Sequence, residues 1–137
     1  MNLFADIRSL VLSTLDTLVA DGFLPEGLSF DAITVEPPRD AAHGDMATNA
    51  AMVLAKPARM KPRDIAEKLA EKLAEDPRIT AADVAGPGFL NLRLSAAVWQ
   101  GVVGAVLGQG TDFGRGDLGQ GKRVNVEYVS ANPTGPL

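Results

Sequence analysis

Six of the fourteen residues from 108 to 121 are glycine, and no other feature of this sequence limits the fold as strongly. Glycine loses more backbone freedom on folding than any other residue, so this density disfavours a regular helix or strand. We therefore predict a loop or domain linker over residues 108–123. It separates a module of residues 1–107 from a short segment, residues 124–137.

The first half of the module alternates between helical and strand patterns. Apolar residues at helical spacing predict a helix over residues 3–19. The alternating sequence 33–36, followed by two prolines, is typical of a short strand. Residues 45–55 are predicted to form a second helix, with Asp45 as its N-cap and Pro57 as its stop.

The second half predicts two further helices and a hairpin. One helix begins near Pro62, where a missing N–H costs little, and closes at Asp76. Residues 79–94 are typical of a hairpin that turns at the Gly-Pro-Gly of residues 86–88. A last helix is expected over residues 95–107, with Gly108 as its C-cap. The module is therefore predicted to be α+β.

After the glycines, the sequence VNVEYVS of residues 124–130 predicts one more strand, and residues 131–137 contain turn-forming residues. A single strand with no neighbour cannot bury both of its faces. The chain is therefore expected to be an incomplete part of a longer protein.

The overall charge disfavours nucleic-acid binding unless positive charge gathers locally, because the chain carries a net charge of −4. Lys56, Arg59, Lys61 and Arg63 fall within eight residues and form one such gathering. The same spacing is also typical of a solvated loop and helix start, which is the commoner case.

Composition excludes several classes of site. The chain has no cysteine and one histidine, so we predict neither a disulfide framework nor a metal site. It has no apolar run long enough for a bilayer and no signal-peptide pattern, which favours a cytoplasmic protein without a membrane partner. The G-x-G-x-x-G match at residues 114–119 precedes a strand instead of opening a helix, so no dinucleotide site is predicted.

The strand predicted over residues 89–94 has one face that fits RNA. Three leucines alternate with Phe89, Asn91 and Arg93, so these three residues share the face opposite the core. An aromatic ring, an amide and a guanidinium suit the stacking and hydrogen bonding of an unstacked base. The alternative is that Phe89 packs under a helix while the other two are solvated, and spacing alone favours it.

Three segments together resemble the arginyl-tRNA synthetases. HGDMATNAAMVLAK (43–56) and AGPGFLNLRL (85–94) are similar to two stretches of that family's N-terminal domain. VNVEYVSANPTGPL (124–137) resembles the entry strand of its class I catalytic domain, which the family follows with His-x-Gly-His. Met46 stands where the family usually has an aromatic residue.

The resemblance implies an N-terminal domain, residues 1–107, with an antiparallel sheet packed on helices, which contacts the D-loop corner of tRNA(Arg). The family's aromatic and amide contact positions match Phe89 and Asn91, and strand alternation adds Arg93. Lys56, Arg59 and Lys61 are expected to face the tRNA. A monomer is expected, and a free-standing RNA-binding or interaction module without catalysis is the alternative.

The resemblance also implies that residues 124–137 begin a Rossmann-like catalytic domain, which joins L-arginine to tRNA(Arg) with ATP and Mg²⁺ as substrates. Ligands of such sheets bind just beyond strand C-termini. Residues expected at the edge of the arginine and ATP pocket are Glu127, Ser130, Ala131, Asn132, Pro133, Thr134 and Gly135. A structural hydrogen bond for Glu127 and simple turn geometry for residues 133–135 are the alternatives. The chain by itself is expected to be inactive and to hold no cofactor.

Overall fold

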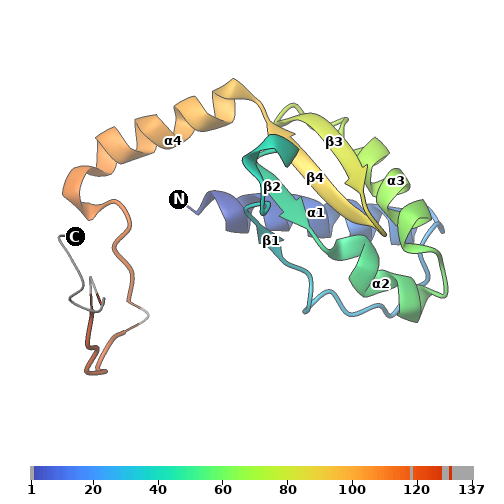
Figure 1. The fold of residues 1–137 in the computed structure, drawn as a ribbon, viewed down its shortest axis with the longest axis horizontal. Helices are drawn as coiled ribbons and strands as arrows, with labels where there is room; N and C mark the ends of the chain where they lie inside the picture. Colours follow the sequence, from blue (N-terminus) through green and yellow to red (C-terminus); the bar gives the residue numbers. More distant parts are fainter. Residues whose placement is uncertain (1, 118, 128–129, 131–137) are drawn as a thin grey trace.

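Helices and strands of residues 3–94 form two layers in the computed structural model, which describes residues 2–117, 119–127 and 130 (Figure 1). In the described chain four strands make one antiparallel sheet in the order β1-β2-β4-β3. The strands are β1 (Val35–Glu36), β2 (Met46–Thr48), β3 (Ile79–Ala85) and β4 (Phe89–Leu94). The helices of this part are α1 (Leu3–Ala20), α2 (Ala50–Ala58) and α3 (Pro62–Leu73), with a 3-10 turn, η1 (Ala41–His43). The predicted α+β class with an antiparallel sheet on helices is confirmed.

The core lies between one face of the sheet and the three helices. The predicted leucine face of β4 is confirmed, since Leu90, Leu92 and Leu94 are all buried. The register pairs Met46 with Leu92 and Thr48 with Leu90, so β2 adds its own buried side chains to the same face. The helical stripes that cover them are Ile7, Val11, Leu15 and Leu18 of α1, and Ile65, Leu69 and Leu73 of α3.

The helix predicted over residues 45–55 is wrong at its start. Asp45 does not cap a helix; its N–H donates to the Leu92 carbonyl at 2.8 Å, and its carboxylate accepts from the Leu94 N–H at 2.7 Å. These bonds lead residues 46–48 into β2, and α2 begins only at Ala50. Pairing with β4 therefore outweighs the helical propensity of this alanine-rich stretch.

Pro57 does not stop α2 either, because the helix runs one residue past it. A proline so close to the C-terminus removes only the one hydrogen bond that its N–H would have made. The helix ends instead at Arg59, which adopts a left-handed φ of 54° and donates its N–H to the carbonyls of Ala55 and Lys56.

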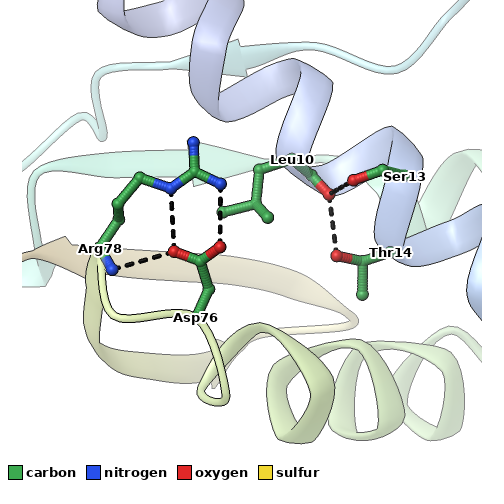
Figure 2. A network of polar contacts seen from close by, with 5 residues as sticks. All are labelled: Leu10, Ser13, Thr14, Asp76 and Arg78. Carbon is green, nitrogen blue, oxygen red and sulfur yellow. Dashed lines mark hydrogen bonds and ion pairs between the residues drawn. The ribbon is translucent and has the colours of Figure 1, made fainter.

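The hairpin of residues 79–94 is confirmed, and a local ion pair leads into it. The Arg78 guanidinium donates to both carboxylate oxygens of Asp76, at 2.9 and 2.8 Å, beside the Leu10 turn of α1 (Figure 2). The hydrogen bonds from Arg78 hold the pKa of Asp76 below its ordinary value. The predicted helix ends at Leu73, so Asp76 belongs to the connection and not to α3.

The chain after residue 94 has a different character. Helix α4 (Ala96–Gln109) extends away from the two layers (Figure 1). It is followed by a 3-10 turn, η2 (Gly110–Asp112). Ser95 takes the N-cap position without a side-chain hydrogen bond, and the C-cap is Gly110 with a φ of 56°, not Gly108. None of the described helices combines the length and hydropathy that a bilayer-spanning segment needs.

The strand predicted over residues 124–130 does not form in its described part. Residues 124–127 and 130 have no strand structure, and Val124 and Val126 are exposed. An extended segment becomes a strand only when a neighbouring strand pairs with its backbone, and no described strand lies beside this one.

Candidate nucleic-acid interface

The described helices leave one face of the sheet uncovered (Figure 1), and the strand register decides which side chains meet there. Glu36 pairs with Ala47, Ala47 with Asn91, and Asn91 with Asp83. Because directly paired residues of antiparallel strands point to the same side, these four form one row across all four strands. The row places the amide of Asn91 at the middle of the open face, with a carboxylate at each end.

A hollow of about 500 Å³ lies on this face. Its floor includes Ala47 and Asn91, and the end of the β3–β4 hairpin forms one side with Ala85, Gly86 and Phe89. The other side comes from β1 and the chain after it, with Glu36, Pro38, Arg39 and His43. A cavity with an apolar ring, a central amide and charged edges has the make-up of a small-ligand or nucleobase site.

Phe89 is the exposed aromatic group of the hollow, with 43% of its surface accessible. Its neighbour Gly88 fixes the hairpin turn beside the start of α3. A Cβ at position 88 would lie 2.7 Å from the Cβ of Pro62, and Gly88 has a φ of 146°. Only glycine lets the hairpin turn pack so closely against the start of α3. The alternative in which Phe89 packs under a helix is wrong.

Asn91 shares the predicted face but is 8% exposed instead of solvated. It lies on a central strand between Ala47 and Asp83, so neighbouring strands cover its stem while its amide lines the hollow. No side-chain hydrogen bond to this amide is found within the described part of the chain. The amide is therefore available to a ligand that enters the hollow.

Arg93 is on the predicted face but is not free for a ligand. Its guanidinium donates to the Ala42 carbonyl at 2.7 Å and does not line the hollow. The bond ties β4 to η1, which follows β1 and belongs to the far side of the hollow. Strand alternation identified the face of Arg93 correctly, but the position of η1 could not be read from the sequence.

The basic residues proposed from spacing do not line the hollow. Lys56 and Arg59 are at the end of α2, and Lys61 precedes α3. Contact between Gly88 and Pro62 places the start of α3 next to the hairpin turn, so Lys61 is near that side. The fourth residue of the group, Arg63, forms an ion pair with Glu67 at 3.2 Å.

Two basic residues that line the hollow were not predicted as site residues. Arg39 and His43 lie in the chain after β1, and the antiparallel pairing of β1 with β2 brings them opposite Phe89. Their spacing in the sequence does not indicate that they share a hollow with Phe89, because the two segments are about fifty residues apart.

The segment GDMATN, which resembles a family motif, has a structural explanation in this fold. Gly44 lies so close to β4 that a Cβ would be 2.7 Å from the Leu92 carbonyl oxygen. Asp45 bonds to β4 as described above. The Asn49 amide accepts from the Thr34 N–H at 2.9 Å and donates to the Ala32 carbonyl at 3.2 Å. These side chains hold β1, β2 and β4 together, and thereby build the open face.

The residues expected at an arginine and ATP pocket are only partly described. Glu127 and Ser130 are exposed. Ala131, Asn132, Pro133, Thr134 and Gly135 lie outside the described residues, so the predicted pocket edge stays a prediction.

Comparison with known proteins agrees with this fold. Residues 5–94 match the family described as "Arginyl tRNA synthetase N terminal domain". Similar curated proteins include the arginine–tRNA ligases of Ruegeria sp. (strain TM1040), 73% identical, Jannaschia sp. (strain CCS1), 72% identical, and Paracoccus denitrificans (strain Pd 1222), 66% identical. Each similarity covers 100% of this chain and 24% of the relative, so the chain spans about a quarter of the length of these proteins. Since the matched region includes all four strands and the three packed helices, the chain belongs to the arginyl-tRNA synthetase N-terminal domain family.

Proposed function

We propose that this chain is the N-terminal part of an arginine–tRNA ligase, and that the open face of its sheet binds the D-loop corner of tRNA(Arg). The observation that carries the proposal is the exposed ring of Phe89 beside the amide of Asn91 in one hollow. Family membership and the similarity to arginine–tRNA ligases support the choice of RNA partner.

The chemistry of the hollow fits a base that has left its stack. Phe89 offers an apolar ring of which 43% is accessible, and base–aromatic stacking contributes roughly 1–3 kcal/mol. Asn91 offers both a donor and an acceptor, which suits the edge of a base. The short distance along β4 between the two residues lets one nucleotide meet both, because they share a face of the strand.

Part of the positive charge for the RNA backbone comes from outside the hollow in this proposal. Lys56, Arg59 and Lys61 are exposed and lie at the adjoining ends of α2 and α3. With a net charge of −4, the chain relies on these local contacts. Binding is therefore expected to be weak and to fall as salt rises.

In the longer protein, residues 124–137 would form the entry strand of a Rossmann-like domain. Glu127, Ser130 and Asn132 would lie at the edge of the pocket for L-arginine and for ATP with Mg²⁺. We expect the 137-residue chain alone to be inactive in aminoacylation. A free-standing module without catalysis is not favoured, since the similar ligases continue well beyond the matched region.

The test is a binding titration of the chain with a tRNA(Arg) transcript, comparing Phe89→Ala with Phe4→Ala. Both rings are exposed to a similar degree, 43% and 38%, but Phe4 lies on α1 and does not line the hollow. Loss of one stacked base predicts that Phe89→Ala weakens binding about tenfold or more, and that Phe4→Ala leaves it unchanged.

Equal affinities for the unchanged chain and Phe89→Ala would remove the open face from the proposal. Equal losses in both variants would show that exposed aromatic rings act non-specifically. Phe89→Tyr is the conservative variant, and it should retain most of the affinity because it keeps the ring.

A further inference from the structure

Resting on the proposed function, we infer that Arg39 binds a backbone phosphate of the nucleotide whose base stacks on Phe89. Arg39 and Phe89 line the same hollow from different segments, Arg39 from the chain after β1 and Phe89 from the β3–β4 hairpin, and Asn91 of β4 lines it as well. A nucleotide that spans the hollow would present its base to one side and its phosphate to the other.

The charges around the hollow support this orientation. Glu36 lines the hollow, and Asp83 ends the same row of side chains on the far edge of the sheet. Both carboxylates repel a phosphate, and Glu36 belongs to the same segment as Arg39, so the attraction has to come from a cation. Arg39 is the arginine among the lining residues, and in the described chain it forms no ion pair. A phosphate that enters the hollow is therefore most stable against Arg39, whose guanidinium matches phosphate geometry.

The segment that carries Arg39 is braced on both sides. Pro37 and Pro38 precede it and restrict the backbone. Asp40 follows it and accepts the Ala42 N–H at 2.9 Å. The Ala42 carbonyl in turn accepts the Arg93 guanidinium at 2.7 Å, which anchors this segment to β4. Arg93 is thus a positioning residue, and Arg39 is the cation that it helps to place.

A side chain on a braced segment loses less freedom on binding than one on a mobile loop, which favours a specific contact. Lys56 and Arg59 do not line the hollow and are at the end of α2. The contact of Arg39 can be tested by the salt dependence of binding, because a direct phosphate contact releases a counterion.

The experiment titrates the full chain with a tRNA(Arg) transcript at several NaCl concentrations. The variants are Arg39→Gln, Arg39→Lys, Phe89→Ala and the matched control Arg115→Gln. Arg115 is exposed and pairs with Asp112 at 2.8 Å in the glycine-rich stretch, so its loss changes the net charge equally.

We expect Arg39→Gln to weaken binding about tenfold and to reduce the slope of log K against log [NaCl] by about one. Arg39→Lys should keep the slope and lose part of the affinity, since lysine keeps the charge without the planar fork. Arg115→Gln should change neither quantity.

The outcomes separate this inference from the proposed function. If Phe89→Ala weakens binding while Arg39→Gln behaves as Arg115→Gln does, the phosphate contact is wrong and the open face stands. If neither Phe89→Ala nor Arg39→Gln weakens binding, both proposals are wrong. A loss with Arg39→Gln at an unchanged salt slope also overturns the phosphate contact, because the side chain would then act only through packing.

Discussion

Helix α4 of residues 95–127 is more apolar than α1 and α3 of residues 3–94, yet only residues 3–94 have a core. Helices α1 and α3 each bury a full stripe of side chains against the sheet. Helix α4 contains Trp99, Val103, Val106 and Leu107, all of them exposed, and no described residue after 94 is buried.

The comparison teaches that helical periodicity and burial are separate properties. Local spacing and propensity are enough to predict α4, and its bounds are close to those expected. A helix side chain is buried only when another part of the protein packs against it. Within the described chain, Val98 in the first turn of α4 is the residue of this helix that packs against the core. Most helical stability in proteins comes from such packing, so α4 should be less stable than the packed helices α1 and α3.

The largest expected effect contrasts two leucines on helices. Leu69 of α3 is 0% exposed and Leu107 of α4 is 79% exposed. Leu69→Ala should lower the free energy of unfolding by about 3 kcal/mol, because it removes buried methyl groups and leaves a cavity. Leu107→Ala should change it by less than about 0.5 kcal/mol. Urea unfolding followed by circular dichroism measures both, and similar losses would show that α4 has a packing surface within this chain.

The next effect contrasts two aspartates. The Asp45 carboxylate accepts the partly buried Leu94 N–H at 2.7 Å, whereas Asp112 pairs with the exposed Arg115. Asp45→Ala leaves the N–H of a central strand without its acceptor, which should cost about 1–3 kcal/mol. Asp112→Ala should be nearly neutral. The same urea experiment applies, and a neutral Asp45→Ala would mean that water replaces the carboxylate.

Much of the fold was predictable because it depends on local patterns. The bounds of α1, the Gly-Pro-Gly hairpin and the leucine face of β4 follow from periodicity and turn chemistry. Residues 45–49 were predicted as part of a helix over residues 45–55, with Asp45 as its N-cap. Bonds from Asp45 to Leu92 and Leu94 decide otherwise, and these partners lie more than forty residues away.

In the candidate site, too, the residues set by local patterns were predicted and those set by distant contacts were not. Phe89 and Asn91 were predicted from alternation along one strand, together with the family resemblance. Arg39 and His43 were not, because the register between β1, β2 and β4 brings them to the hollow. The guanidinium of Arg93 was assigned to the ligand, and its bond to Ala42 depends on the same register. The pairing of strands that are far apart in the sequence cannot be predicted from local sequence patterns.

The smallest expected effect concerns pH and again compares the two regions. The hydrogen bonds from Arg78 hold the pKa of Asp76 below its ordinary value (Figure 2). A carboxylate with a lowered pKa in the folded state stabilises that state above its unfolded pKa, about 3.9, and this contribution is lost as pH falls through the folded pKa. Asp76→Asn should therefore be less stable than the unchanged chain near neutral pH.

The difference should be at most about 1 kcal/mol, because the Arg78 side chain is 44% exposed and solvent screens the pair. It should shrink as the pH is lowered from about 7 towards the folded pKa of Asp76, since the unchanged chain loses the ionised carboxylate there. Asp112→Asn, in the region without a core, should differ little from the unchanged chain at either pH. Urea midpoints across this range test both variants. A gap for Asp76→Asn that stays constant with pH would mean that the pair acts through packing, and not through the charge of Asp76.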